Sequence, residues 1–251
     1  MEQARDIEKT SVFFDSELKP GKFLKRPNRF LAEVLIDTGV VLAHIADPGR
    51  LKELLVPNTQ VFLLPKSGEN RKTKWQLLLV QSNDTLVSLN STLPNELVYK
   101  ALKGRKIDEF AEYDLIKPEY KVGSSRFDFA LAKKEDRSTC KKKNIPSCLL
   151  EVKSVTLVED SLALFPDAPT KRGTKHLKEL IELKKEGIDT AVLFVVQRDD
   201  ANAVKANRKT DLEFALTLKQ AYESGVSLFA YKTRLDLEKI TLKESLTVII
   251  D

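Results

Sequence analysis

The sequence predicts an α/β protein with two domains: a small N-terminal β-barrel or compact sheet, followed by a mixed sheet flanked by helices. Four short strand-like segments, separated by Gly, Pro, Asn and Asp, occur before residue 84. Beyond that position, helical segments alternate with apolar strands, as in a sheet covered by helices. The 251 residues suffice for one large domain or two ordinary ones. We therefore expect domains of residues 1–86 and 87–251.

In the N-terminal part, the strand-like segments surround a short helical candidate at residues 51–55. The expected strands are residues 30–36, 40–45, 61–64 and 75–81. A basic run at residues 19–29 carries five positive charges and no acid. Small barrels of this kind bind single strands with a cationic groove and aromatic stacking surfaces. The candidate DNA contacts here are therefore Lys25, Arg26, Arg29 and Arg50.

The C-terminal part begins with an expected helix over residues 93–102, where Pro94 suits the first turn and Gly104 follows the end. A long amphipathic segment, residues 170–187, predicts a second helix. The β-branched, apolar run at residues 190–197 predicts a buried strand. The other expected elements are strands at residues 120–123, 126–131, 149–154, 226–233 and 242–250 and a helix at 211–224.

The composition is that of a globular protein with mild positive charge. Hydrophobic residues make up 42% and charged residues 31% of the chain, which argues against disorder. The net charge of +5 suits a polyanionic partner without identifying one. Cys140 and Cys148 are too few for a disulfide framework or a zinc cluster. The longest apolar run is too short to span a bilayer, and no N-terminal signal region is seen, so we expect a cytoplasmic protein without membrane contact.

Two carboxylates and a lysine are the strongest chemical signal. Glu151 and Lys153 alternate along one strand and therefore share a face. Asp128 takes the matching face of another strand, with Phe127 and Phe129 opposite. On neighbouring strands these three polar groups would meet, and converging carboxylates suit Mg²⁺ or Mn²⁺ while the ammonium activates water. The alternative is an ordinary ion pair on a surface sheet.

The order of a helix, three strands, a helix and a strand around these residues resembles the core of the PD-(D/E)XK nuclease superfamily. More closely, the chain resembles the sugar fermentation stimulation protein family (SfsA) from about residue 26 onward. The resemblance is carried by Ser-Arg-Phe-Asp-Phe at 125–129, Glu-Val-Lys-Ser-Val-Thr-Leu at 151–157 and the long segment 165–177. It implies an N-terminal OB-type barrel, a C-terminal nuclease-like domain and binding to DNA.

Carried over by position, the resemblance makes Asp128 and Glu151 metal ligands for Mg²⁺ or Mn²⁺ and Lys153 the catalytic lysine. Glu96 falls where the superfamily often supplies a further acid, with a solvated helix residue as an equal alternative. Glu119, before the first core strand, is a weaker alternative for the same role.

A second cluster of basic residues opens the expected helix at 170–187. Helix N-termini favour anions because their backbone N–H groups are free and the helix dipole is positive there. The cluster predicts a phosphate grip beside the carboxylates, and a solvated basic helix start is the alternative. With Arg126 from the matching strand, it completes the candidate DNA contacts: Lys171, Arg172, Lys175 and His176.

Two functions follow from these residues. The first is a Mg²⁺- or Mn²⁺-dependent phosphodiesterase acting on DNA. The second is a non-catalytic DNA-binding regulator of sugar (maltose) metabolism genes on the same scaffold. The chain shows no helix suited to reading bases, so we expect little sequence preference. Single- versus double-strand preference, protein partners and the choice between monomer and homodimer stay open.

Overall fold

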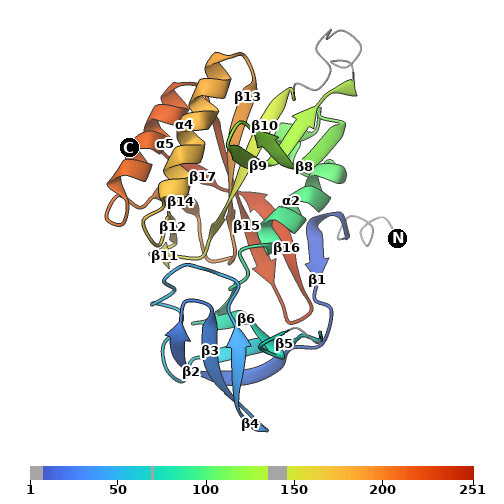
Figure 1. Cartoon of the computed structure of the whole chain (residues 1–251), viewed down its shortest axis with the longest axis vertical. Coiled ribbons are helices and arrows are strands. Elements are labelled where there is room, and N and C mark those ends of the chain that lie inside the picture. The colour runs from blue at the N-terminus through green and yellow to red at the C-terminus, as the bar shows by residue number, and fades with distance from the viewer. Residues whose placement is uncertain (1–7, 69–70, 135–145) are drawn as a thin grey trace.

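The N-terminal part of the chain forms a closed five-stranded barrel, below the larger domain in Figure 1. The computed structural model describes residues 8–68, 71–134 and 146–251. The barrel sheet has the order β4-β3-β2-β5-β6-β7, and an additional parallel pairing of β4 with β6 closes it. The closed ring consists of β2 (Lys19–Asn28), β3 (Leu31–Ile36), β4 (Gly39–His44), β5 (Gln60–Pro65) and β6 (Trp75–Ser82). Strand β7 (Thr85–Ser88) extends the sheet from β6.

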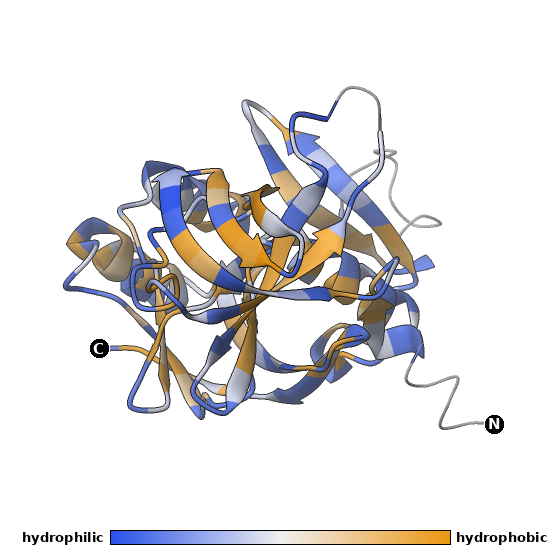
Figure 2. Cartoon of the chain, turned by 90° about the horizontal axis from the view of Figure 1, so that it is seen from below, coloured by the Kyte–Doolittle hydropathy of each residue, from blue (hydrophilic) through white to orange (hydrophobic). Residues whose placement is uncertain are grey.

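Hydrophobic and hydrophilic residues alternate along the barrel strands, as the colouring in Figure 2 shows. On β3, Ala32, Val34 and Ile36 are buried whereas Leu35 is exposed. Gly21 permits β2 to cross β3 closely, because a Cβ there would lie 2.6 Å from Val34.

Two local features of the barrel differ from the sequence-based expectation. The basic run at residues 19–29 is strand β2 for almost its whole length. The helix expected at residues 51–55 is wrong, since this segment is a turn in which Leu54 and Leu55 donate to the Leu51 carbonyl. Leu51 has a left-handed φ of 51°, which ends regular helical geometry at its first residue.

The C-terminal part is a seven-stranded mixed sheet with the order β1-β16-β15-β13-β10-β9-β8. Its central strands β10, β13 and β15 are parallel. Helix α2 packs on one face, and α4 and α5 pack on the other (Figure 1). The elements are β8 (Leu115–Val122), β9 (Ser125–Ala132), β10 (Cys148–Val155), β13 (Asp189–Val196), β15 (Ser227–Leu235), α2 (Leu93–Lys103), the 3-10 helix η1 (Asp108–Phe110), α4 (Lys171–Lys185) and α5 (Leu212–Glu223).

The first strand of the chain belongs to the large sheet and not to the barrel. Strand β1 (Ser11–Phe13) pairs antiparallel with β16 (Lys239–Ser245), with Val12 opposite Ile240. The Ser11 and Thr241 hydroxyls are also hydrogen-bonded at 2.8 Å. From β1 onward, the chain therefore passes from the large domain to the barrel and back to the large domain.

A small third sheet carries the segment that leads into α4. It consists of β11 (Val158–Glu159), β12 (Leu162–Phe165), β14 (Ala203–Ala206) and β17 (Thr247–Ile249). The single strand expected at residues 242–250 is thus wrong: it divides between β16 and β17, in different sheets. At the division, the Leu246 N–H donates to the Ala230 carbonyl at 2.8 Å. Among the described residues, no helix is long and apolar enough to cross a membrane.

Candidate functional site

Asp128 lies where strands β9 and β10 separate. Their paired register ends at Leu150 opposite Phe129. Just beyond it, the Val152 N–H donates to Asp128 Oδ2 at 2.8 Å, so the side chain replaces a backbone acceptor. The amide of Asn95, from the first turn of α2, donates to Oδ1 at 2.7 Å. The carboxylate is thereby fixed between a strand and a helix.

The alternation of β9 is broken at this point. Phe127 packs in the core cluster beneath α4, whereas Phe129 packs in the cluster beneath α2. The expectation that both rings lie on one face opposite Asp128 is therefore wrong. The neighbouring strand is irregular at the same level, because Glu119 has a φ of 56°. The irregularity explains how Asp128 reaches its partners outside a regular ladder.

Glu151 is a buried carboxylate with two polar partners on one oxygen. Its Oε1 accepts a hydrogen bond from Lys153 Nζ at 2.5 Å and lies 2.5 Å from His176 Nδ1. Glu151, Lys153 and His176 are 4%, 9% and 3% exposed. The second oxygen, Oε2, is buried and lacks a hydrogen-bond partner among the described residues. A buried, unpartnered carboxylate oxygen is costly unless a cation or donor binds it.

The two carboxyl groups respond oppositely to this environment. Burial, followed by the negative charge of Glu151, raises the pKa of Asp128 to about 6. Burial also pushes the pKa of Glu151 upward. The hydrogen bond from His176 and the charge of Lys153 outweigh that effect and hold the pKa below its usual value.

Asp128, Glu151 and Lys153 line one cavity of about 510 Å³, to which both domains contribute. The barrel supplies Arg29 and the loop at residues 47–49. The larger domain supplies Glu119, residues of β10, and residues 164–170, which comprise the end of β12 and the segment after it. Arg172, from the start of α4, also lines it. The predicted meeting of two carboxylates and the lysine in one place is what the structure shows.

Arg26 shapes the barrel loop of this cavity. Its guanidinium donates to the carbonyls of Gly49 at 2.8 Å, Arg50 at 2.7 Å, Asp47 at 3.2 Å and Arg29 at 2.5 Å. Burial lowers the pKa of Arg26, although Asp47 and Asp167 oppose the shift. These contacts describe a residue that fixes the loop, so a role in DNA contact stays a prediction that they do not support.

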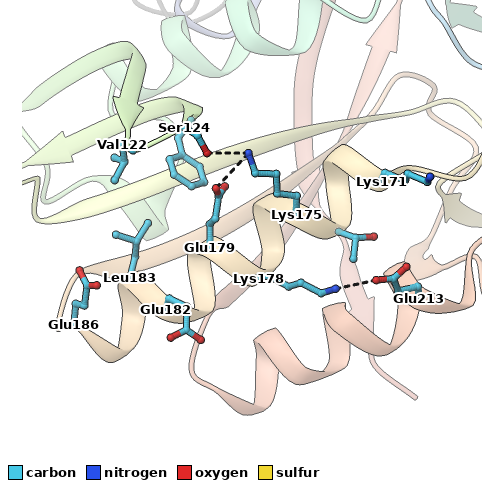
Figure 3. A pocket seen from close by; sticks show the side chains of 13 residues that line it. Val122, Ser124, Lys171, Lys175, Lys178, Glu179, Glu182, Leu183, Glu186 and Glu213 are labelled. Carbon is cyan, nitrogen blue, oxygen red and sulfur yellow. Dashed lines mark hydrogen bonds and ion pairs between the residues drawn. The ribbon is translucent and has the colours of Figure 1, made fainter.

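The basic cluster of α4 divides among three environments. Thr170 caps the helix by accepting the Gly173 N–H at 3.0 Å. From this start, Arg172 reaches the Asp128 cavity and His176 turns inward to Glu151. Lys171 and Lys175 line a second cavity of about 800 Å³ between α4 and the turn after β8 (Figure 3). The helical period of 3.6 residues explains why neighbours in sequence separate in this way.

The second cavity also holds ion pairs, which occupy two of its lysines, Lys175 and Lys178. Lys175 donates to Ser124 Oγ at 3.1 Å and lies 3.6 Å from Glu179 (Figure 3). Lys178 donates to Glu213 at 2.8 Å.

The remaining candidates lie at the edges. Glu96 is exposed, lies 3.8 Å from Lys100 and does not line the Asp128 cavity. Its neighbour Asn95 faces Asp128 instead. Arg126 pairs with Glu119 at 2.7 Å. Glu119, the alternative acid, lines the Asp128 cavity.

On the barrel, Lys25 lies 3.3 Å from Glu33. Arg50 is exposed, and its N–H donates to Asp167 Oδ2 at 2.7 Å. Asn95 and Asp167 were not anticipated from the sequence. A polar residue in the first turn of α2 and an acid inside the 165–177 segment were the available signals.

The fold and the site together define an OB-barrel protein with a restriction-endonuclease-like α/β domain. Residues 24–89 match the family model described as the SfsA N-terminal OB domain, and residues 92–239 match that of the sugar fermentation stimulation protein RE domain. The chain belongs to the sugar fermentation stimulation protein family, which confirms the resemblance and the fold class.

Relatives cover nearly the whole chain. A sugar fermentation stimulation protein homolog of Clostridium botulinum (strain Langeland) is 42% identical over 229 residues, covering 91% of this chain and 96% of its own. That of Clostridium tetani is 40% identical over 239 residues, covering 95% and 100%. The solved structure of Pyrococcus furiosus SfsA in complex with Ca²⁺ has a TM-score of 0.83 at 30% identity, covering 94% of this chain and 97% of its own.

Proposed function

We propose that this protein hydrolyses phosphodiester bonds of DNA with the help of Mg²⁺ or Mn²⁺ held by Asp128 and Glu151. The observation that carries the proposal is the buried Oε2 of Glu151. Among the described residues it lacks a hydrogen-bond partner, and Glu151 lines the same cavity as Asp128. A hard cation satisfies such an oxygen, because Mg²⁺ and Mn²⁺ prefer carboxylate ligands.

The residues present fit a cation that retains much of its water. Within the described residues, no group of three or more acidic, histidine or cysteine side chains is placed to hold a metal. Two carboxylates suffice for Mg²⁺, which commonly binds one or two and keeps several waters. The Ca²⁺ complex of the Pyrococcus furiosus relative supports a divalent site in this family. When bound, the metal lowers the pKa of its water and offsets charge on the phosphoryl group.

The side chains around the metal site prepare the substrate and the water. Lys153, held by Glu151, presents an ammonium that orients the attacking water and balances developing negative charge. His176 holds Glu151 Oε1, so Oε2 is left for the cation. Arg29 and Arg172 place guanidinium groups in the same cavity, where they bind phosphate oxygens.

Purified protein incubated with plasmid, linear duplex and single-stranded DNA tests the proposal, with Mg²⁺, Mn²⁺ or chelator. We expect cutting that requires the metal, is lost in Asp128→Asn and persists in Asp84→Asn, a control in the exposed turn between β6 and β7. Metal-independent cutting that is equal in both variants would be contamination and would contradict the proposal. Tight DNA binding without metal-dependent cutting would instead favour a non-catalytic regulator.

A further inference from the structure

The barrel loop over the Asp128 cavity is fixed to the larger domain. The Arg50 N–H donates to Asp167 Oδ2 at 2.7 Å, and the Ser91 hydroxyl donates to the Ala46 carbonyl at 2.8 Å. Gly49 sits where any Cβ would strike the carboxylates of Asp47 and Asp167, so the loop approaches the other domain as closely as a backbone can. The loop therefore forms one wall of the cavity and is held in place by the larger domain.

The reactive groups are buried in the cavity that this loop lines. Glu151 is 4% and Lys153 is 9% exposed, and the cavity volume of about 510 Å³ is that of a site for a small ligand. A paired duplex carries its phosphates on a convex surface, and the complementary strand holds them there. Such a surface cannot bring a phosphodiester to Glu151 past a fixed wall, and enzymes that act deep in a pocket extrude or unpair their target.

An unpaired strand meets no such obstacle, and the cavity carries cations to receive it. Arg29 comes from the barrel and Arg172 from α4, both exposed. In the part of the chain that the structure describes, neither guanidinium has an ion-pair partner, whereas Lys25 and Arg126 do. Two free guanidinium groups from two domains can bind phosphates along one flexible backbone.

We propose, building on the proposed phosphodiesterase function, that the cavity admits a single unpaired DNA strand between the barrel and the nuclease-like domain. Its substrates are then single strands and the unpaired tails of duplexes, and fully paired DNA is excluded. Arg29 and Arg172 hold the strand from opposite domains. The loop fixed by Asp167 enforces the discrimination.

Binding of labelled oligonucleotides with chelator present tests strand choice apart from cleavage. The ligands are a short single strand, the same sequence as a blunt hairpin duplex, and that duplex with a single-stranded tail. We expect the single strand and the tailed duplex to bind about tenfold or more tightly than the blunt duplex. Equal or tighter binding of the blunt duplex, or no binding of any ligand, would overturn the inference.

Matched variants locate the effect in the cavity. Arg29→Ala and Arg172→Ala should each weaken single-strand binding about tenfold. Lys22→Ala, an exposed barrel cation outside the cavity, should bind like the wild type. Asp167→Ala removes the acceptor of the Arg50 N–H and should reduce the ratio of single-strand affinity to blunt-duplex affinity. An unchanged preference in this last variant would overturn the role given to the loop.

Cleavage with Mn²⁺ separates this inference from the proposed function. Strand-selective binding without any cutting that depends on Asp128 would remove the enzyme and leave the inference standing. Cutting of blunt duplex that depends on Asp128 and equals cutting of the single strand would support the proposed enzyme and overturn the inference about single strands.

Discussion

Asp128 is the residue at which burial and charge conflict most directly. Its pKa is raised to about 6 from the ordinary 3.8, mainly by burial. Between these pH values the folded protein binds a proton that the unfolded chain has released. The free energy of unfolding therefore falls as pH rises through this window, and above it the ionised carboxylate costs about 3 kcal/mol.

Asp128→Asn should relieve this cost in metal-free protein. At pH 8 we expect the variant to exceed the wild type in free energy of unfolding by about 1–2 kcal/mol, since one hydrogen bond is weakened while the charge is removed. The difference should shrink as pH is lowered to 4. Urea unfolding across this range measures it. A difference that is constant with pH would show that Asp128 does not titrate as its surroundings indicate.

His176 supports Glu151 from the buried face of α4. His176→Ala removes a hydrogen bond to a buried charge and leaves a gap beside the Phe127 ring, whose centroid lies 5.6 Å from that of His176. We expect a loss of about 2–3 kcal/mol in free energy of unfolding. His176→Asn, whose amide can replace Nδ1, should recover part of it. Equal losses in the two variants would show that packing alone matters.

At the scale of single residues, the sequence predicts which side chains form the site better than it predicts which residues contact them. Period-two alternation places Glu151 and Lys153 together because it depends only on neighbours within one strand. The contact of Asn95 with Asp128 joins residues 33 apart in sequence, through the packing of a helix on a sheet. The irregularity at Asp128 follows from the separation of two strands, which no local pattern records.

Helices α4 and α5 act as a pair through one capping side chain. Asp211 Oδ1 accepts the Phe214 N–H at 2.9 Å and caps α5, while Oδ2 accepts the Thr170 N–H at 2.7 Å at the start of α4. Asp211 thus fixes the segment from which Arg172 enters the cavity. A single carboxylate serves two helix ends because both helix starts lie together.

Asp211→Ala should therefore lower the free energy of unfolding more than the loss of an ordinary helix cap does. We expect about 2 kcal/mol of lost unfolding free energy, against about 1 kcal/mol for one cap. The control is Lys209→Ala, at an exposed position two residues earlier. It should change the free energy of unfolding by less than about 0.5 kcal/mol. Thermal or urea unfolding measures both. A loss no larger than that of the control would contradict the shared role.

Elements with strong periodicity were predictable, and those defined by their neighbours were not. The buried run that forms β13 and the amphipathic α4 follow from their apolar patterns. Strand β2 is interpreted only as a basic segment, because its exposed or partly exposed positions include Lys and Arg. Which of its residues face the barrel interior follows only from the closed barrel. The division of residues 242–250 between β16 and β17 depends on which sheet each half meets.

At the scale of the whole molecule, β1 joins the two ends of the chain. Deleting residues 1–14 should destabilise the large domain, because β16 becomes an unpaired edge and buried Ile240 loses Val12. We expect a loss of about 2–4 kcal/mol in unfolding free energy and stronger aggregation. Deletion of residues 1–7 keeps β1 and is the control. Equal stability of both deletions would remove this role.

The pairing of β1 with β16 also sets an order of events during synthesis. Ser11 and Thr241 are separated by 230 residues, so the first strand of the sheet is made long before its partner. At about 5–20 residues per second, it waits roughly 10–50 s on the ribosome. The barrel can close in that interval because its strands are contiguous. The larger domain is completed only when the last strands emerge, so a closed barrel precedes a finished Asp128 cavity in every newly made molecule.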